Sequence, residues 1–275
     1  MKRLLHVMVA LLSLVGAGYL GSLGYQQLYA LWDKNTQSVL VLGNAGVRHI
    51  AFIMDGNRRW AKSQNLMPWD GHKSGVGPVK EAVRFCLDHG IDVLSLYAFS
   101  LENFKRSNDE LSHLFDIIEM GLSTDDIKEL AQHGVRIRFV GERDRFPARL
   151  IKTIEAIETA TMQGQKLLVN MLFCYGGRQE LCAAAQQLAT EVFQGGLAPQ
   201  EITEECFEQA LWTGAYPLPD MVVRTGGEHR LSNFMPWQSA YSELFFVDTY
   251  WPAMSRADFE SLLVAFERRK RNFGA

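Results

Sequence analysis

The chain has 275 residues, enough for one large α/β domain or two small ones. Its apolar content of 47% and charged content of 21% are ordinary for a globular protein. The net charge of −3 excludes a generally basic surface of the kind that binds nucleic acid, so any anion must be bound by a few placed arginines.

The N-terminal segment differs from the rest of the chain. A basic start, Met1–Arg3, precedes a mostly apolar run from Leu4 to Tyr25, which is long enough to cross a hydrocarbon core of about 30 Å. Aromatic residues continue beyond this run, as in an interfacial belt. We therefore expect residues 1–32 to form a membrane anchor, with a cleaved signal peptide or an interfacial helix as the alternatives.

The basic residues leave the topology of this anchor open. Lys2 and Arg3 would keep the N-terminus inside and send the following chain across the membrane, whereas the motifs described below suit substrates of the cytosol. A tail that only enters the inner leaflet would remove the conflict. We predict a membrane-associated protein, with a linker at 33–46 and a globular domain at 47–275 on the cytoplasmic side.

From His49 onward, short apolar runs alternate with segments of helical periodicity. The expected strands are 49–54, 91–99, 135–140 and 167–173, followed by two short ones at 221–223 and 244–247. The expected helices are 73–89, 108–133 (with a break near Ser123 and Thr124), 147–163, 177–193 and 257–271. Because continuous apolar strands suit a sheet covered on both faces, we predict a single α/β domain with a mostly parallel central sheet flanked by helices.

The first polar cluster, Asp55–Lys62, directly follows the first expected strand. Ligands of open parallel sheets bind beyond the carboxyl ends of the strands. Asp55 is therefore well placed to hold Mg²⁺, which takes one or two protein carboxylates plus phosphate oxygens. The next two residues allow a tight turn, and Arg58 and Arg59 add charge and bidentate geometry for phosphate. On composition alone, a turn with exposed arginines is an equal alternative.

Three further clusters accompany later strands: Ser100–Arg106, Arg224–Ser232 and the surroundings of Glu243. In the second of these, two arginines six residues apart flank a Gly-Gly turn with a hydroxyl nearby, which would suit a diphosphate. The sequence contains neither the P-loop pattern nor the dinucleotide-binding glycine pattern. Glu243 is either a second metal ligand or a charge at the edge of a strand.

Together these clusters resemble the ordered motifs of the cis-prenyltransferase family, to which undecaprenyl and dehydrodolichyl diphosphate synthases belong. The motifs are His49–Lys62, Gly71–Lys73, Leu96–Phe104 with Arg106, Tyr175–Arg178, and Arg224–Phe234 through Glu243. The match runs from about His49 to Gly274, nearly the whole globular part. The resemblance implies that residues 47–275 are a catalytic domain.

The resemblance implies a role for each matching residue. Asp55 would bind Mg²⁺ together with a diphosphate and be essential to catalysis, and Asn103 would assist removal of a proton. The residues that would hold the diphosphate of the allylic primer are Gly56, Asn57, Arg58, Arg59, His72 and Arg106. Those that would line the same site are Trp60, Ser100, Leu101, Glu102 and Phe104. Isopentenyl diphosphate would be held by Arg224, Arg230, Leu231 and Ser232, and the metal and diphosphate environment would be completed by His229 and Glu243.

Two positions depart from the family's pattern. Four residues before His72, where the family usually has an arginine, this chain has Pro68, so one expected diphosphate contact is missing. Arg58, which many bacterial members replace with glycine, would then supply a substitute charge. The asparagine that commonly precedes the Tyr-Gly-Gly-Arg motif is Cys174, a change that concerns local packing more than chemistry.

The implied activity is the condensation, in cis, of isopentenyl diphosphate with an allylic diphosphate such as farnesyl diphosphate. The product would be a polyprenyl diphosphate, the cofactor Mg²⁺, and the partners a membrane lipid and a second copy of the chain in a homodimer. The growing apolar chain needs an apolar tunnel. Candidates for its wall, each equally suited to an ordinary core, are Val83, Leu94, Leu96, Ala98 and Leu167.

Two other classes of protein compete with this interpretation. A non-catalytic partner subunit of a heteromeric prenyltransferase is the main alternative, but such a subunit has no need for Asp55 and Arg106 together with Arg224 and Arg230. An α/β phosphatase or nucleotide-binding protein would need a nucleophile motif or a P-loop, and the sequence has neither.

Overall fold

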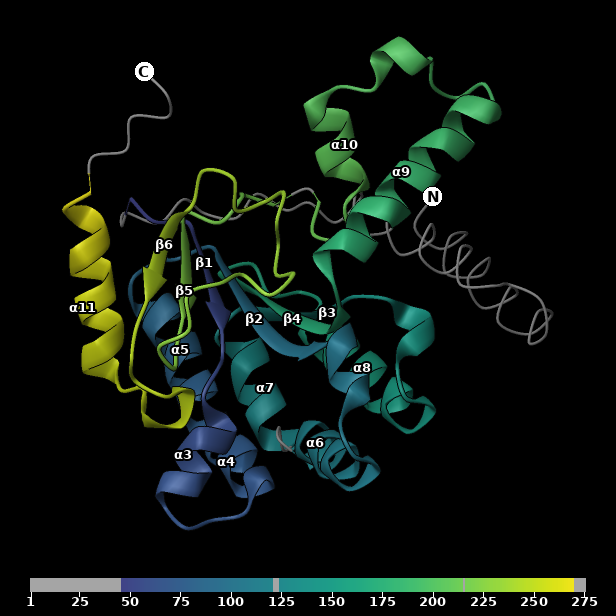
Figure 1. Cartoon of the computed structure of the whole chain (residues 1–275). Coiled ribbons are helices and arrows are strands. Elements are labelled where there is room, and N and C mark those ends of the chain that lie inside the picture. Colours follow the sequence, from purple (N-terminus) through teal and green to yellow (C-terminus); the bar gives the residue numbers. More distant parts are fainter. Residues whose placement is uncertain (1–45, 121–123, 215, 270–275) are drawn as a thin grey trace. The chain divides into compact units, whose positions relative to one another are not determined.

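The computed structural model describes residues 46–120, 124–214 and 216–269 (Figure 1). The segment expected to form a membrane anchor, 1–32, lies outside the described residues, and so does nearly all of the expected linker at 33–46. No helix within the described part of the chain is both long and apolar enough to cross a membrane.

Six strands form one central sheet in the order β3-β4-β2-β1-β5-β6. Their bounds are β1 His49–Ile53, β2 Val93–Ser100, β3 Val135–Val140, β4 Leu167–Tyr175, β5 Met221–Arg224 and β6 Glu243–Phe246. Every residue of β1 and β5 is buried, as expected for mainly apolar strands that are covered on both faces. The α/β fold is confirmed. The sequence predicts a mostly parallel sheet, and among the described residues every strand pairing is parallel.

The helices that connect and cover the strands are α3 Asn57–Ser63, α4 Pro68–Ser74, α5 Val76–Asp88, α6 Asn108–Met120, α7 Thr124–Gln132, α8 Ala148–Thr161, α9 Gly177–Phe193, α10 Glu204–Ala210 and α11 Arg256–Glu267. Over the expected helix at 108–133, α6 ends at Met120 and α7 begins at Thr124, and the expected break near Ser123 and Thr124 falls largely outside the described residues. The segment after Asp55, expected to be a turn, instead begins a helix.

The expected helix over 73–89 is also different, because it is divided into α4 and α5 at Gly75. The indole N–H of Trp251 donates to the backbone oxygen of Gly75 at 2.9 Å. A Cβ at position 75 would lie 2.8 Å from Oδ1 of Asn57 and 3.0 Å from the Trp251 ring. The chain therefore bends where the indole and the start of α3 approach its backbone.

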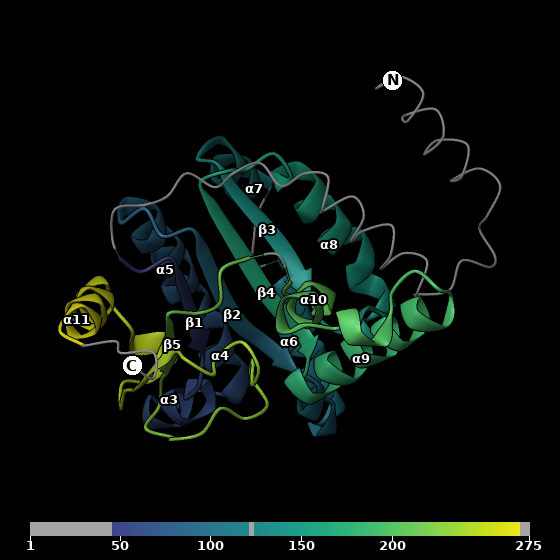
Figure 2. The ribbon, with the colours of Figure 1, turned by 90° about the horizontal axis from the view of Figure 1, so that it is seen from above.

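The side chains of β1 alternate between two apolar layers. Ile50 and Phe52 belong to the larger layer, which includes buried residues of α5, α8 and α11. Ala51 and Ile53 belong to a smaller layer on the other face. Burial of Phe52, which is 2% exposed, is worth about 1.5–3 kcal/mol. Figure 2 shows α7 and α8 beside β3 at one edge of the sheet, with α11 toward the other edge.

The order of the strands changes direction at β1. From β1 the chain adds β2, β3 and β4 on one side of it, and then β5 and β6 on the other. Such a reversal leaves a crevice beyond the carboxyl ends of the two strands that flank it, where α/β sheets bind ligands. Asp55 follows β1 and Thr225 follows β5. The fold therefore places the first and third polar clusters side by side.

Candidate functional site

An ion pair joins the carboxyl ends of β1 and β5. Arg224 Nη2 donates to Asp55 Oδ2 at 2.8 Å, and the backbone N–H of Gly56 donates to Asp55 Oδ1, which lies 3.3 Å from Arg59 Nη2. Partial burial raises the pKa of Asp55, but the hydrogen bonds from Arg224 and Gly56 and the nearby guanidinium charges outweigh it and lower the pKa below its usual value. Asp55 is therefore an ionised carboxylate held at the ligand-binding edge.

Arg224 also organises the loop that follows β5. Its side chain is 5% exposed, and Nη1 donates to the backbone oxygen of Arg230 and, at 2.7 Å, to the hydroxyl of Ser232. Ser232 has a φ of 50°, in the left-handed region, so the loop turns sharply back at this point. Arg224 thus fixes Asp55 on one side and the segment from Arg230 to Ser232 on the other. Leu231, between them, packs against the smaller apolar layer.

Glu228 connects two arginines at the exposed rim of the site. Its Oε1 lies 3.3 Å from Arg59 Nη1, and its Oε2 lies 2.5 Å from Arg230 Nη1. The hydrogen bond from Arg230 and the charges of Arg230 and Arg59 lower the pKa of Glu228. Because Arg59 also contacts Asp55, a continuous chain of ion pairs runs from the carboxyl end of β1 to Arg230.

Two arginines and a histidine surround Glu110, in the first turn of α6. Glu110 Oε1 lies 3.2 Å from Arg106 Nη1, 3.7 Å from His72 Nε2 and 3.9 Å from Arg58 Nε. The structure therefore brings together three residues that the family resemblance assigns to the primer's diphosphate. Burial and the charge of Arg106 lower the pKa of His72 to about 4, against the opposing effect of Glu110, so the imidazole is neutral at pH 7.

Gly71 makes it possible for His72 to reach this position. Helices α3 and α4 pack so closely that a Cβ at Gly71 would lie 2.1 Å from the backbone oxygen of Asn57. The side-chain amide of Asn57 donates to the backbone oxygen of Met54 at 2.9 Å, which fixes the start of α3 against the end of β1. A larger residue at position 71 would push α4, and His72 with it, away from the site.

The cluster after β2 forms a short 3₁₀ helix, Leu101–Lys105. The backbone N–H of Ser100 donates to Oδ1 of Asn103 at 3.1 Å, so the two residues cap the helix, and Asn103 faces the cavity described below. Leu101 and Phe104 pack against the larger apolar layer. Asn103 is thus directed toward the site, whereas the two apolar residues hold the helix in place.

Asn233 joins three of the sequence motifs. Its side-chain amide donates to Glu102 at 3.2 Å and to Gln179 at 3.1 Å, and its Oδ1 accepts from the backbone N–H of Arg178 at 2.8 Å. Asn233 has a φ of 65°, a left-handed conformation that asparagine tolerates better than most residues. The sequence does not single out this residue, although it lies within a quoted motif. Its role is to connect the loop after β5 to the Tyr-Gly-Gly-Arg turn.

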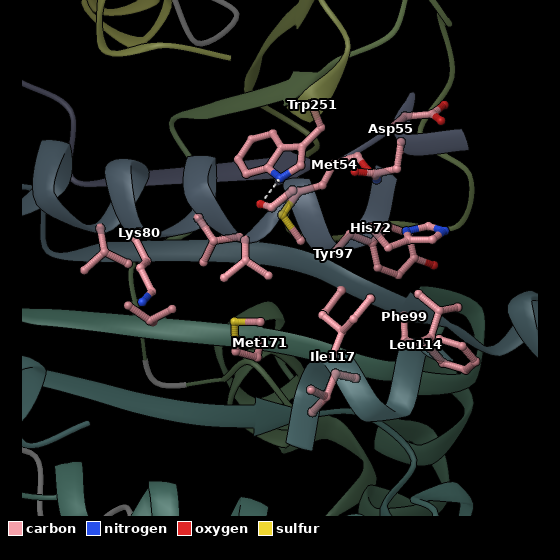
Figure 3. Close-up of a pocket in the computed structure, with 18 of the residues that line it drawn as sticks. Met54, Asp55, His72, Lys80, Tyr97, Phe99, Leu114, Ile117, Met171 and Trp251 are labelled. Atoms are coloured by element: carbon pink, nitrogen blue, oxygen red, sulfur yellow. Dashed lines mark hydrogen bonds between the residues drawn. The ribbon is translucent and has the colours of Figure 1, made fainter. Parts of the chain in front are cut away.

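A large, mainly apolar cavity opens at these polar residues. Its volume is about 1190 Å³, above the roughly 300–1,000 Å³ of typical small-molecule sites. Figure 3 shows Asp55 and His72 at one end and Lys80 at the other, with Met171 and Ile117 between them. Apolar side chains along it include Val79, Val83, Ile118, Ile137 and Val169. A charged mouth and an apolar interior suit an amphiphile with an anionic head and a hydrocarbon tail.

The sequence identifies only part of the wall of this cavity. Val83 and Ala98 line it, as expected, whereas Leu94, Leu96 and Leu167 are fully buried core residues. Leu94, Leu96 and Leu167 instead pack in the larger apolar layer together with buried residues of α5, and only the carboxyl-terminal part of β2 borders the cavity. Apolar residues of β3 and β4 line the cavity beside this end of β2.

Within this chain, the three metal ligands implied by the resemblance do not form one cluster. Asp55 lies beyond the carboxyl end of β1, whereas Glu243 begins β6 and pairs with Met221 at the amino end of β5. At about 3.3 Å per residue, the strand length separates the two carboxylates by more than ~10 Å. The imidazole of His229 stacks on Phe246, with ring centroids 4.9 Å apart. Among the described residues, no group of three His, Cys, Asp or Glu side chains could hold a metal ion.

The structure places both residues that depart from the family's pattern, Pro68 and Cys174. Pro68 is the first residue of α4 and lines the cavity. Arg58 also lines the cavity, and its side chain is 60% exposed. Cys174 is buried near the end of β4 with a φ of 49°, a region that asparagine occupies more readily than cysteine. Burial raises the pKa of the Cys174 thiol, so it is a neutral packing residue.

The chain is similar to one family of known sequences over most of its length. A family model described as "Putative undecaprenyl diphosphate synthase" matches residues 53–274. The "Ditrans,polycis-undecaprenyl-diphosphate synthase ((2E,6E)-farnesyl-diphosphate specific)" of Pseudomonas aeruginosa is 43% identical over 227 residues, which cover 82% of this chain and 90% of that protein. The protein of the same name from Escherichia coli strain K12 is 44% identical over 229 residues, covering 83% and 90%.

Two solved structures of prenyl diphosphate synthases also resemble this chain in fold. Lavandulyl diphosphate synthase from Lavandula x intermedia, in complex with dimethylallyl diphosphate, superposes with a TM-score of 0.80 and 34% identity, covering 83% of this chain and 98% of that one. A probable undecaprenyl diphosphate synthase from Campylobacter jejuni superposes with a TM-score of 0.68 and 32% identity, covering 83% and 99%.

Proposed function

The chain belongs to the undecaprenyl diphosphate synthase family of cis-prenyltransferases, and from this premise we propose that it condenses isopentenyl diphosphate with farnesyl diphosphate in cis. Repeated condensation would give a long polyprenyl diphosphate, the precursor of a lipid carrier. The names of the bacterial relatives specify farnesyl diphosphate and an undecaprenyl product for those proteins.

One observation carries this proposal. The cations assigned to two diphosphates meet at one edge of the sheet, and a cavity of about 1190 Å³ leads away from them between apolar walls. Arg58, His72 and Arg106 gather around Glu110, whereas Arg224 contacts both Asp55 and the backbone oxygen of Arg230. A non-catalytic subunit would need neither this pairing of cationic groups nor an apolar space of this size.

The arrangement suits a reaction that needs charge stabilisation and no protein nucleophile. As the allylic C–O bond breaks, the departing diphosphate takes the electron pair, and Arg58 and Arg106 would stabilise the developing charge. The double bond of isopentenyl diphosphate would then form the new C–C bond with the allylic cation, and one proton would pass from the resulting carbocation to an oxygen of the departed diphosphate. The side chain of Asn103 lines the cavity near these groups and would assist that proton loss.

Asp55 is the residue that we propose holds Mg²⁺. Its carboxylate is ionised and 30% exposed, and it borders the cavity. One carboxylate with phosphate oxygens is a common ligand set for Mg²⁺. When bound, the ion would neutralise charge on the diphosphate and so ease ionisation. The contribution of His229 and Glu243 to this environment stays a prediction.

We also propose, from the sequence, how the enzyme is placed in the cell. Residues 1–32 would hold it at the membrane with the catalytic domain on the cytoplasmic side, and two copies would form a homodimer. A long apolar product supports membrane association, because such a product partitions into lipid.

The test is incorporation of radiolabelled isopentenyl diphosphate by the purified full-length chain, with farnesyl diphosphate and Mg²⁺ in detergent. Labelled product extractable into an organic solvent is expected from wild type. Asp55→Ala should lower turnover by orders of magnitude with the fold intact. Wild-type protein that binds both diphosphates but forms no product would favour the non-catalytic subunit instead.

A further inference from the structure

Glu110 is an acidic residue at the centre of the cations assigned to the primer's diphosphate. Its side chain is 12% exposed, and Arg106, His72 and Arg58 all face its Oε1 oxygen. None of the motifs described above includes Glu110. Its position is unexpected for a diphosphate site, because a carboxylate repels the anion that the surrounding cations would bind.

The contacts of Glu110 are those of a replaceable anion. Only Arg106 lies within hydrogen-bond distance, at 3.2 Å. Nε2 of His72 is buried and makes no hydrogen bond to any described residue, although Glu110 stands 3.7 Å away. A diphosphate offers several charged oxygens where Glu110 offers one, so it could contact both guanidinium groups and the neutral imidazole of His72 at shorter distances.

We propose that Glu110 is an internal competitor of the primer's diphosphate and so sets the affinity of the site for it. In the empty site its carboxylate holds the neutral His72 and the two arginines, Arg58 and Arg106, together and offsets the repulsion between the two guanidinium groups. The incoming diphosphate takes over these three contacts and displaces the carboxylate. When diphosphate departs, Glu110 returns to the cations and disfavours rebinding. This inference rests on the proposed function, because it assumes that the anion is a diphosphate.

The location of Glu110 also connects the charged head of the site to the tunnel. It lies in the first turn of α6, and Leu114, Ile117 and Ile118 of the same helix line the cavity. Helix α6 contacts α4, which carries His72. A diphosphate that displaces Glu110 would therefore act at the start of a helix that forms part of the cavity wall.

The experiment measures binding of inorganic pyrophosphate, in the presence of Mg²⁺, to the full-length protein in detergent by calorimetry. Glu110→Gln should bind pyrophosphate at least about tenfold more tightly than wild type, because the competing charge is removed. The KM for farnesyl diphosphate should fall in parallel, while the KM for isopentenyl diphosphate stays unchanged. Asp109→Asn is the matched control, since Asp109 is the exposed neighbour of Glu110 in the same helical turn and its loss changes the net charge equally.

Equal or weaker pyrophosphate binding by Glu110→Gln would overturn the inference, since it would show that Glu110 organises the cations for the ligand. Should that variant not fold, Glu110→Asp provides the test, because it keeps the charge but withdraws it by one methylene. Tighter binding is again expected, and binding no tighter than wild type would contradict the proposal. The titration needs no turnover, so wild type that binds pyrophosphate but forms no product would defeat only the proposed function.

Discussion

Arg224 Nη2 donates a hydrogen bond to Asp55 Oδ2 at 2.8 Å, although 169 residues separate the two in the sequence. The bond ties the end of β1 to the end of β5 at the point where the strand order reverses. It also stabilises the ionised form of Asp55, whose pKa lies below its usual value. Arg224 therefore positions Asp55 and Ser232, in addition to the diphosphate contact predicted for it, and this distinguishes it from the exposed Arg230.

Arg230→Ala should raise the KM for isopentenyl diphosphate about 10- to 100-fold, the loss expected for one charge-assisted contact. Because Arg230 is 57% exposed, the melting temperature should not change. Arg224→Ala, by contrast, should lower the melting temperature and raise the KM of both substrates, because it releases Asp55 and Ser232. Steady-state kinetics with each substrate varied in turn provide the check. An Arg230→Ala enzyme whose farnesyl KM rises instead would mean that the two diphosphate sites are assigned the wrong way round.

The two glycines after β5 allow strain and site geometry to be separated. Gly226 and Gly227 have φ values of 84° and 74°, so alanine is strained at both. A Cβ at Gly226 would lie 2.8 Å from Nη2 of Arg59 and 3.3 Å from the backbone of Asp55, whereas one at Gly227 would meet only Asp248, at 3.2 Å. Both variants should lose about 1 kcal/mol or more of stability. Only Gly226→Ala should also lose kcat/KM, by about tenfold or more. Equal activity of the two variants would show that Arg59 need not occupy its observed place.

Because Pro68 stands where the family usually has an arginine, we predict that kcat/KM for the allylic primer depends strongly on Arg58. Pro68 supplies neither charge nor an N–H donor, so Arg58→Gly should cause a large loss in kcat/KM for the primer. Pro68→Arg should restore part of the loss, since both positions line the same cavity. The two single variants and the double variant give a coupling energy. Strict additivity would show that Arg58 does not compensate for Pro68.

His49 predicts a pH dependence of stability that is separate from catalysis. Its Nδ1 contacts the backbone oxygen of Pro217 at 2.7 Å and its Nε2 contacts Ser95 at 2.8 Å. Burial lowers the pKa of His49 from 6.5 to about 4. Between these values the unfolded state binds the proton and the folded state does not, so stability falls as the pH falls from 6.5 to 4. The slope from this residue is at most about 1.4 kcal/mol per pH unit.

Urea titrations at pH 7, 6 and 5 measure this slope. His49→Gln should be less stable than wild type at pH 7 but should lose less stability on acidification. Parallel pH profiles for the two proteins would contradict a neutral, buried His49.

Much of the fold follows from local sequence patterns. The strand 135–140 and the helix 177–193 occur where apolar runs and helical periodicity predict them. The sequence does not predict the short helices α3 and α4, because seven residues carry little periodicity, and the residues after Asp55 suggest a phosphate-binding turn. The division at Gly75 depends on contacts with Trp251, which is 176 residues away in the sequence.

The candidate site is predictable to the extent that the motifs follow strands. Asp55 follows β1 and Arg224 ends β5, so the two lie at one edge of the parallel sheet, and His72 reaches the same site from α4, which packs on α3. The position of Glu110 in the site is not predictable from the sequence, because an acidic residue in the first turn of an amphipathic helix is usually solvated. Only the packing of α6 against α4 reveals its cationic neighbours. The amino-end position of Glu243 likewise depends on the register between β5 and β6, which no motif encodes.

The central claim is that condensation takes place at the charged edge of the sheet, and that the growing prenyl chain extends from there into the apolar cavity. The most direct measurement is the mass-spectrometric distribution of product lengths from Ile117→Trp, compared with wild type and with Ile151→Trp. Ile117 lies midway along the cavity, whereas Ile151 is an exposed residue of α8. The account predicts long polyprenyl diphosphates from wild type and Ile151→Trp, and products shorter by several isoprene units from Ile117→Trp. An unchanged length distribution from Ile117→Trp, or no polyprenyl product from wild type, would contradict it.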